Sequence, residues 1–224
     1  MYFHSNEYLS TEFFEKKYQH LKMLAICGGA DISLILTGLH RVKELVLVDL
    51  NDKQFDVFKS KKEFIENDPL GLNYLLFYYI PKNEKDDFSI FSKFLPRTKD
   101  FVEKNLEEIV ESKKQLYPLF FEEYIDALSY QDGIYEYLSN ETFDVNYVKG
   151  DILDFFSKDF DVVYLSNVID FIPIRNLSHF VEELGLLKDD VVIYDSSKFL
   201  NRTMVPYVNQ YSKKELIMSI LKKF

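Results

Sequence analysis

Short apolar runs separated by longer mixed stretches dominate the hydrophobic pattern of this chain. Four runs are apolar at nearly every position, and a fifth is weaker; they cover residues 23–27, 45–49, 161–166, 191–195 and, for the weaker run, 145–148. A strand that is covered on both faces needs such a continuous run, whereas a half-exposed strand alternates. The pattern therefore predicts a parallel sheet that is buried on both sides.

Helical patterns alternate with the first of these strands. Residues 30–39 carry apolar side chains at helical spacing, and Gly38 stands where a helix C-cap is expected. After the second strand, Asn51 can N-cap a helix that runs to about residue 64, with Phe55 and Phe58 on its apolar stripe. The order strand, helix, strand, helix is typical of an α/β fold.

The pattern changes between residues 69 and 140, where lysine, glutamate and aromatic residues form long helical-looking stretches interrupted by prolines. We interpret this segment as an inserted helical subdomain. Its apolar positions are expected mainly to pack in a core, and the alternative is that they line a substrate or partner site. The predicted fold is thus a doubly wound, mostly parallel Rossmann-like sheet formed by residues 1–68 and 141–224. A short loop and a basic helix over residues 213–223 end the chain.

Composition limits which kinds of binding partner and which cellular compartment the sequence favours. The net charge is −10 and only 4 of the 27 basic residues are arginine, which disfavours a nucleic-acid substrate. A single cysteine, Cys27, and an amino terminus without a signal-peptide layout predict a cytoplasmic protein. No apolar run reaches the roughly 20 residues that span a bilayer, so a membrane contact would be peripheral. The four histidines share no metal-ligand spacing, and we expect no metal site.

The first strand ends in Gly28-Gly29, and the second strand ends in Asp49, twenty residues after Gly29. Glycines at a strand-to-helix turn let a ligand approach the backbone, and an acid at the end of the next strand can accept hydrogen bonds from ribose hydroxyls. Either feature alone is weak, because such an Asp often only caps a helix. Together, in this strand context, they predict a nucleoside site.

The third glycine of a dinucleotide motif is absent, and Asp31 adds negative charge where a pyrophosphate would bind. These electrostatics favour a ligand that is cationic and carries no phosphate. S-adenosylmethionine fits better than NAD on this ground. Asp31 has an equally good alternative role as an N-terminal helix cap.

Three segments resemble the class I S-adenosylmethionine-dependent transferases, and more narrowly the betaine-lipid-synthase branch, whose members transfer the 3-amino-3-carboxypropyl group instead of the methyl group. They read Gly28-Gly29-Ala30-Asp31, then Val48-Asp49-Leu50-Asn51 with Gln54, then Leu165-Ser166-Asn167-Val168-Ile169-Asp170-Phe171. The similarity covers roughly residues 20–65 and 145–196, with a helical insertion between them as in that branch. The amino-terminal 20 residues show no clear copy of the family's entry segment, and only 29 residues follow the last predicted strand.

The resemblance implies a role for each matching residue. Gly28 and Gly29 would lie under the methionine portion and Asp49 at the ribose, and Asp31 and Leu50 are further cofactor-binding candidates. Asn51 and Gln54 would lie beside the adenosine or hold its loop, with Asp151 at the adenine amino group and Ile152 against the ring. Ser166 would lie at the reacting end of the cofactor, where Asn167 and Asp170 are the catalytic candidates. Simpler alternatives remain open: Asn51 as a helix cap, Gly150-Asp151 as a turn, and Asp170 as the cap of the next helix.

The implied function is transfer of the aminocarboxypropyl group from S-adenosylmethionine to a small-molecule or lipid acceptor, with release of methylthioadenosine. Two alternatives stay open at this point. One is a small-molecule methyltransferase of the same fold, and the other is a regulatory protein that binds the cofactor without turnover.

Overall fold

The computed structural model describes residues 7–9, 22–67, 134–201 and 207–223. Their Cα positions group into two compact units. One unit, the sheet unit, holds the described parts of residues 7–26, 40–50 and 143–224. The other, the helical unit, holds the described parts of residues 27–39 and 51–142.

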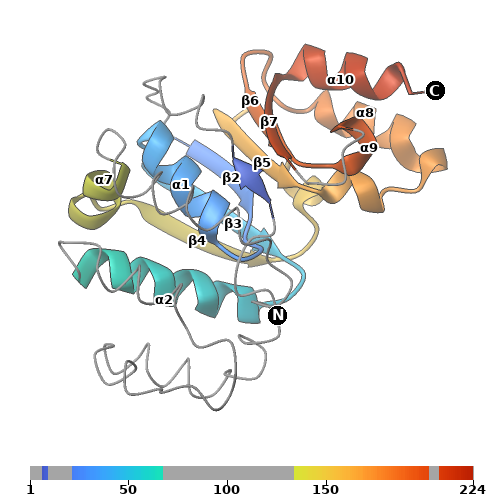
Figure 1. Ribbon diagram of the computed structural model, residues 1–224. Coiled ribbons are helices and arrows are strands. Elements are labelled where there is room, and N and C mark those ends of the chain that lie inside the picture. Colours follow the sequence, from blue (N-terminus) through green and yellow to red (C-terminus); the bar gives the residue numbers. More distant parts are fainter. Residues whose placement is uncertain (1–6, 10–21, 68–133, 202–206, 224) are drawn as a thin grey trace. The chain divides into compact units, whose positions relative to one another are not determined.

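The sheet unit contains a seven-stranded sheet in the order β1-β7-β6-β5-β2-β3-β4 (Figure 1). Its strands are β1 (Tyr8–Leu9), β2 (Lys22–Ile26), β3 (Glu44–Asp49), β4 (Asp144–Lys149), β5 (Val162–Ser166), β6 (Val192–Asp195) and β7 (Tyr207–Ser212). All neighbouring pairs are parallel except β6 with β7. From β2 the order runs to β3 and β4 on one side and to β5 and β6 on the other, which is the doubly wound, Rossmann-like arrangement.

All five strands predicted from the apolar runs are present. The central strands β2 and β5 are buried along almost their whole length, as the continuous runs required. The weakest prediction, residues 145–148, became β4 at an edge of the sheet, where exposed and half-buried positions alternate. An edge strand needs fewer apolar side chains, and this explains why its signal was faint.

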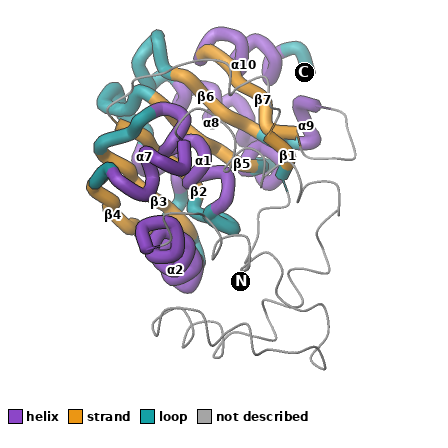
Figure 2. Tube along the Cα trace, turned by 60° about the vertical axis from the view of Figure 1, so that its left-hand side comes forward, coloured by secondary structure: helices purple, strands orange, loops and turns teal. Residues whose placement is uncertain are grey.

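Two strands escaped the sequence analysis. β7 has the polar sequence Tyr-Val-Asn-Gln-Tyr-Ser and pairs antiparallel with β6, in a segment that we expected to hold a loop. β1 has only two residues and pairs with β7 at the end of the sheet (Figure 2). β1 is too short to form an apolar run, and in β7 only Val208 is buried, so neither strand has the pattern of a buried strand.

The core of the sheet unit lies between the sheet and two helices, α8 (Leu177–Leu184) and α10 (Lys213–Leu221). Phe180, Leu184, Leu216 and Ile220 from these helices pack with buried residues of the central strands. Short helices connect the layers: η3 (Ile152–Phe155), η4 (Val168–Phe171), η5 (Ile174–Asn176) and α9 (Lys198–Asn201). None of the helices described is long and apolar enough to cross a membrane.

The helical unit contains α1 (Asp31–His40), α2 (Lys53–Asn67) and α7 (Ile134–Asn140). The expectation that Gly38 ends the first helix was wrong, because α1 continues through it and Arg41, with φ +54°, follows the last turn. A Cβ on Gly38 would lie 2.6 Å from Cγ2 of Ile134. The glycine therefore permits close packing against α7. Of the predicted insertion, residues 69–133 lie outside the described residues.

Candidate functional site

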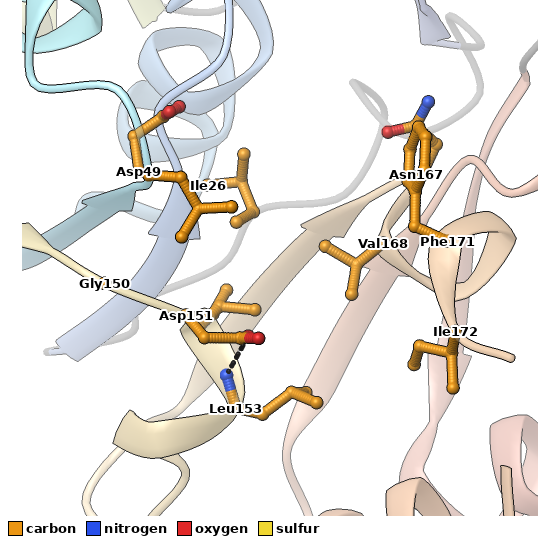
Figure 3. Close-up of a pocket in the computed structure, with 11 residues that line it drawn as sticks. Ile26, Asp49, Gly150, Asp151, Leu153, Asn167, Val168, Phe171 and Ile172 are labelled. Carbon is orange, nitrogen blue, oxygen red and sulfur yellow. Dashed lines mark hydrogen bonds between the residues drawn. The ribbon is translucent and has the colours of Figure 1, made fainter. Parts of the chain in front are cut away.

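A pocket of about 280 Å³ lies at the carboxyl ends of four neighbouring strands of the sheet unit (Figure 3). It is lined by Ile26 of β2, Asp49 and Leu50 at the end of β3, Gly150, Asp151, Ile152 and Leu153 after β4, and Asn167, Val168, Phe171 and Ile172 after β5. β2 and β5 are the adjacent strands from which the chain winds in opposite directions. Ligands of open α/β sheets bind at this topological switch point.

Five residues predicted from the sequence meet in this pocket although they come from three separate segments: Asp49, Leu50, Asp151, Ile152 and Asn167. Parallel strands bring their carboxyl ends to one edge, and β4 pairs with β3 in a register that sets Lys149 opposite Asp49. The chain then turns at Gly150, whose N–H donates to the Asp49 carbonyl at 3.2 Å. The segments that carry the two carboxylates are thereby fixed side by side.

The lining is apolar apart from two carboxylates and one amide. Of the described residues that line the pocket, none is basic, while Asp49 and Asp151 are acidic. Leu50 and Phe171 are 73% and 76% exposed, and they contribute apolar surface that is open to solvent. Such a wall disfavours phosphate groups and favours a neutral or cationic ligand with a flat apolar part.

Asp151 has a structural task as well as a place in the lining. One of its carboxylate oxygens accepts from the backbone N–H of Leu153 at 3.1 Å and caps η3 (Figure 3). A role of Gly150-Asp151 in a turn is therefore compatible with a place of Asp151 in the pocket lining. Ile152, the next residue, is buried and packs in the core below the pocket.

The end of β5 forms an unusual corner. Ser166 has φ +55°, a left-handed conformation that costs a residue with a Cβ about 1–2 kcal/mol. The pairing of β5 with β6 also shifts register between Tyr164 and Ser166. Asn167 follows as the N-cap residue of η4, but its side chain makes no capping hydrogen bond. The amide of Asn167 lies in the pocket lining, on the side of the view opposite to Asp49 (Figure 3).

Asp170, one of the two catalytic candidates, is not among the residues that line the pocket. Its carboxylate accepts from the backbone N–H groups of Lys198 at 2.9 Å and Phe199 at 2.8 Å. Those are the first residues of α9, so Asp170 caps a helix, but a more distant one than the next helix that its alternative role named. Asn167 is the candidate that the pocket retains.

The turn at Gly28-Gly29, called the glycine turn below, belongs to the helical unit. Two side chains of α2 donate hydrogen bonds to its backbone carbonyls. Gln54 donates its side-chain amide to the Gly28 carbonyl, and the ammonium of Lys61 donates to the Gly29 carbonyl at 2.8 Å. Gly28 has φ +49° and open space where a Cβ would lie. Of the two roles foreseen for Gln54, this contact is the one that holds the loop. Asn51 accepts from the Lys53 N–H at 3.2 Å at the start of α2.

Asp31 is ion-paired within the protein. Its carboxylate lies 2.6 Å from the Lys61 ammonium, and both side chains are buried. Burial lowers the pKa of Lys61, and the attraction of Asp31 opposes that shift. The expectation that Asp31 offers its charge to a cationic ligand therefore needs correction, because Lys61 already compensates it. Lys61 follows Phe58 by three residues and precedes Ile65 by four, so it stands on the apolar stripe of α2 and could have been noticed.

Two buried carboxylates, Glu7 and Asp195, lie at the carboxyl ends of β5 and β6, and the sequence pattern predicted neither of them. Glu7 is buried and accepts from the hydroxyls of Tyr164, Ser166 and Ser196. Burial raises the pKa of Asp195 to about 7 against the opposing hydrogen bonds of Ser197, with smaller contributions from the negative charges of Glu7 and Asp170. Glu7 stands in an amino-terminal segment that mixes aromatic and polar residues without a regular period, so no sequence signal marked it.

Comparisons with known proteins add little to this description. No family model matches the chain, and no curated protein matches it. Among solved structures, the chain is similar to the rRNA methyltransferase aviRa from Streptomyces viridochromogenes, at 12% identity and a TM-score of 0.39. The match covers 83% of this chain and 71% of that chain.

Proposed function

We propose that the protein is an S-adenosylmethionine-dependent transferase whose pocket holds the adenosine part of that molecule. One observation carries the proposal: Asp49, Asp151 and Asn167, each at or just after the carboxyl end of a different parallel strand, line one pocket at the switch point of the sheet. A carboxylate at the end of the second strand of such a sheet is suited to accept from two ribose hydroxyls. Asp151 and Ile152 offer an acceptor and an apolar face to a purine.

The electrostatics of the lining support a sulfonium nucleoside over a dinucleotide. A diphosphate needs basic groups or open backbone N–H groups, while the described lining provides two carboxylates and no basic side chain. A volume of about 280 Å³ lies just below the roughly 300–1,000 Å³ typical of ligand pockets. It suits one nucleoside better than two.

For the transferred group, we propose 3-amino-3-carboxypropyl, on the ground of the family resemblance of the segments around Asp49 and Asn167. S-adenosylmethionine, when bound, would supply a carbon activated by its bond to a cationic sulfur. The chain would contribute position: carboxylates that fix the adenosine, apolar side chains such as Val168 and Phe171 that exclude water, and an amide at Asn167 that orients the acceptor.

Calorimetric titration of S-adenosylmethionine into the purified protein tests the site. Asp49→Ala removes the proposed ribose acceptor and should weaken binding by roughly 1.5–3 kcal/mol, which is about a 10- to 150-fold rise in Kd. Asp144→Ala is the matched control, because Asp144 is exposed at the opposite end of the adjacent strand β4. Equal Kd values for wild type and Asp49→Ala would remove Asp49 from the site.

Product analysis tests the chemistry. Incubation with S-adenosylmethionine and a panel of amines, thiols and lipid acceptors should release methylthioadenosine. Release of S-adenosylhomocysteine would instead establish a methyltransferase. Tight binding with neither product across the panel would favour a regulatory protein that binds the cofactor without turnover.

A further inference from the structure

Glu7 makes a concentration of polar contacts that the proposed function does not use. Its side chain is buried, with 2% of the residue exposed. One carboxylate oxygen accepts from the Tyr164 hydroxyl, and the other accepts from the hydroxyls of Ser166 and Ser196. A buried carboxylate is costly unless donors surround it, and three hydroxyl donors supply that compensation.

The donors are not scattered. Tyr164 and Ser166 belong to β5, and Ser196 follows β6 directly. The N–H of Ser196 also donates to the carbonyl of Ser166 at 2.8 Å. Glu7 therefore bridges the carboxyl ends of two adjacent strands at the point where their register shifts.

Ser166 is the one of these donors that has a strained backbone. Its φ of +55° is unfavourable for a residue with a Cβ, and such a conformation persists only where surrounding contacts enforce it. Ser166 has a hydroxyl bond to Glu7 and a backbone bond from Ser196, and its hydroxyl also lies 3.4 Å from Oδ1 of Asn167. The next residue, Asn167, lines the pocket.

We propose that Glu7 is a positioning residue for the pocket: it holds Ser166 in its left-handed conformation, and thereby sets the direction in which Asn167 leaves the sheet. The inference rests on the proposed function for its meaning, since Asn167 lies at the reacting end of that site. Glu7 acts through Ser166 and does not line the pocket itself. The amino-terminal segment thus contributes to a site that is formed from distant parts of the chain.

Two variants of Ser166 separate this role from simple packing. Ser166→Ala loses the bond to Glu7 and keeps the cost of positive φ, whereas Ser166→Gly loses the same bond but adopts that φ freely. We expect Ser166→Ala and Glu7→Gln each to raise the Kd for S-adenosylmethionine at least tenfold, and Ser166→Gly to raise it much less. Adding Glu7→Gln to Ser166→Gly should change the Kd little further, because the Ser166 contact, through which Glu7 reaches the pocket in this proposal, is already absent.

Asp161→Asn is the destabilising control. Asp161 lies before β5, at the end of the sheet opposite Ser166, where it accepts from the Lys22 N–H at 2.9 Å and from the Lys188 ammonium. The variant should lower the melting temperature as Glu7→Gln does, while its Kd stays that of wild type. If Asp161→Asn and Glu7→Gln weaken binding equally, Glu7 acts only through stability and the proposal is overturned.

Hydrogen exchange provides a readout that needs no ligand. The N–H of Ser196 donates to Ser166, and the N–H of Asp170 donates to the Asn167 carbonyl at 3.0 Å. Both amides should exchange faster in Glu7→Gln than in Asp161→Asn. Unchanged exchange at both amides would overturn the role of Glu7. Failure of the wild type to bind S-adenosylmethionine would count against the proposed function alone. The exchange measurement would still show whether Glu7 holds the backbone at Ser166 and Asn167.

Discussion

Asp195 shows how a single buried side chain can couple the fold to pH. It ends β6 and is fully buried. One of its carboxylate oxygens accepts from the N–H and hydroxyl of Ser197, at 3.0 and 2.7 Å, while the other has no hydrogen-bond partner within the described chain. Burial raises the pKa to about 7, so the carboxyl group keeps its proton in the folded state over a range where the unfolded chain has lost it.

The stability of the protein should therefore fall as pH rises from about 4 to 7. In that interval the folded state binds one more proton at Asp195 than the unfolded state, and the free energy of unfolding drops by up to about 1.4 kcal/mol per pH unit. The contribution is complete below the unfolded pKa and lost above the folded one. Asp195→Asn should flatten this part of the profile and be more stable than wild type at pH 8. Urea unfolding at several pH values measures it, and parallel profiles would contradict the assignment.

At the scale of the element, α2 acts as a clamp on the glycine turn through Gln54 and Lys61. Cys27, at the start of the turn, also contacts the helix by donating its thiol to the Gln54 carbonyl at 3.2 Å. The helix thereby fixes a turn that contains two left-handed residues, Gly28 and Ala30. A helix interior is more rigid than a loop, which makes it a suitable support for such a turn.

Lys61→Met should destabilise the protein by roughly 3–5 kcal/mol, because it removes the cation that compensates the buried carboxylate of Asp31. Lys59→Met is the control on the same helix, since the ammonium of Lys59 is partly exposed and lies 3.5 Å from Asp56. That change should cost less than 1 kcal/mol. Denaturant unfolding compares the two variants. Equal decreases in the free energy of unfolding would show that the buried pair stabilises the fold no more than the exposed pair does.

The carboxyl-terminal helix α10 begins with a capping box. The Ser212 hydroxyl accepts from the Glu215 N–H at 3.3 Å, and the Glu215 carboxylate accepts from the Ser212 N–H at 2.8 Å. Ser212→Ala should cost about 1 kcal/mol. Ser219→Ala, inside the same helix, should be neutral or slightly stabilising because alanine has the higher helix propensity. A thermal melt of both variants checks the difference, and similar midpoints would contradict it.

At the scale of the whole molecule, the order of the strands decides where chemistry can gather. Because β2 and β5 are adjacent and the chain winds outward from them in both directions, the segments after β3, β4 and β5 can border one pocket. In open α/β sheets, the crevice outside the carboxyl ends of the strands forms at the point where the strand order reverses. The pocket is thus a consequence of topology, and its ligand preference is a consequence of the side chains that end each strand.

Ligand binding should appear as a stabilisation of the folded protein. S-adenosylmethionine at 100 times its Kd should add about 2.7 kcal/mol, which for a chain of this size is roughly 5–10 °C in melting temperature. NAD at the same concentration should produce no shift, because the lining repels its diphosphate. Differential scanning fluorimetry makes the comparison. A larger shift with NAD than with S-adenosylmethionine would reverse the preference that we derive from Asp49 and Asp151.

Local pattern was enough to predict five of the seven strands that the structure describes and part of the pocket. A run such as 45–48 must be covered on both faces, and parallel strands place their carboxyl ends at one edge, so the pattern predicted Asp49 at a ligand site. The family resemblance implied Asp151 and Asn167, and all three residues line the pocket. The prediction for β4 was weaker, because an edge strand leaves less apolar signal.

Other features depend on contacts between residues that are far apart in sequence, which no local window contains. The bond from Ser166 to Glu7 spans 159 positions, and the partner that neutralises Asp31 is 30 positions away. The polar strand β7 exists because β6 offers a backbone edge to it. The amino-acid sequence by itself determined which segments become buried strands and which acids end them. Tertiary pairing alone decided which charges are compensated, which corner is strained and which of the candidate residues reach the pocket.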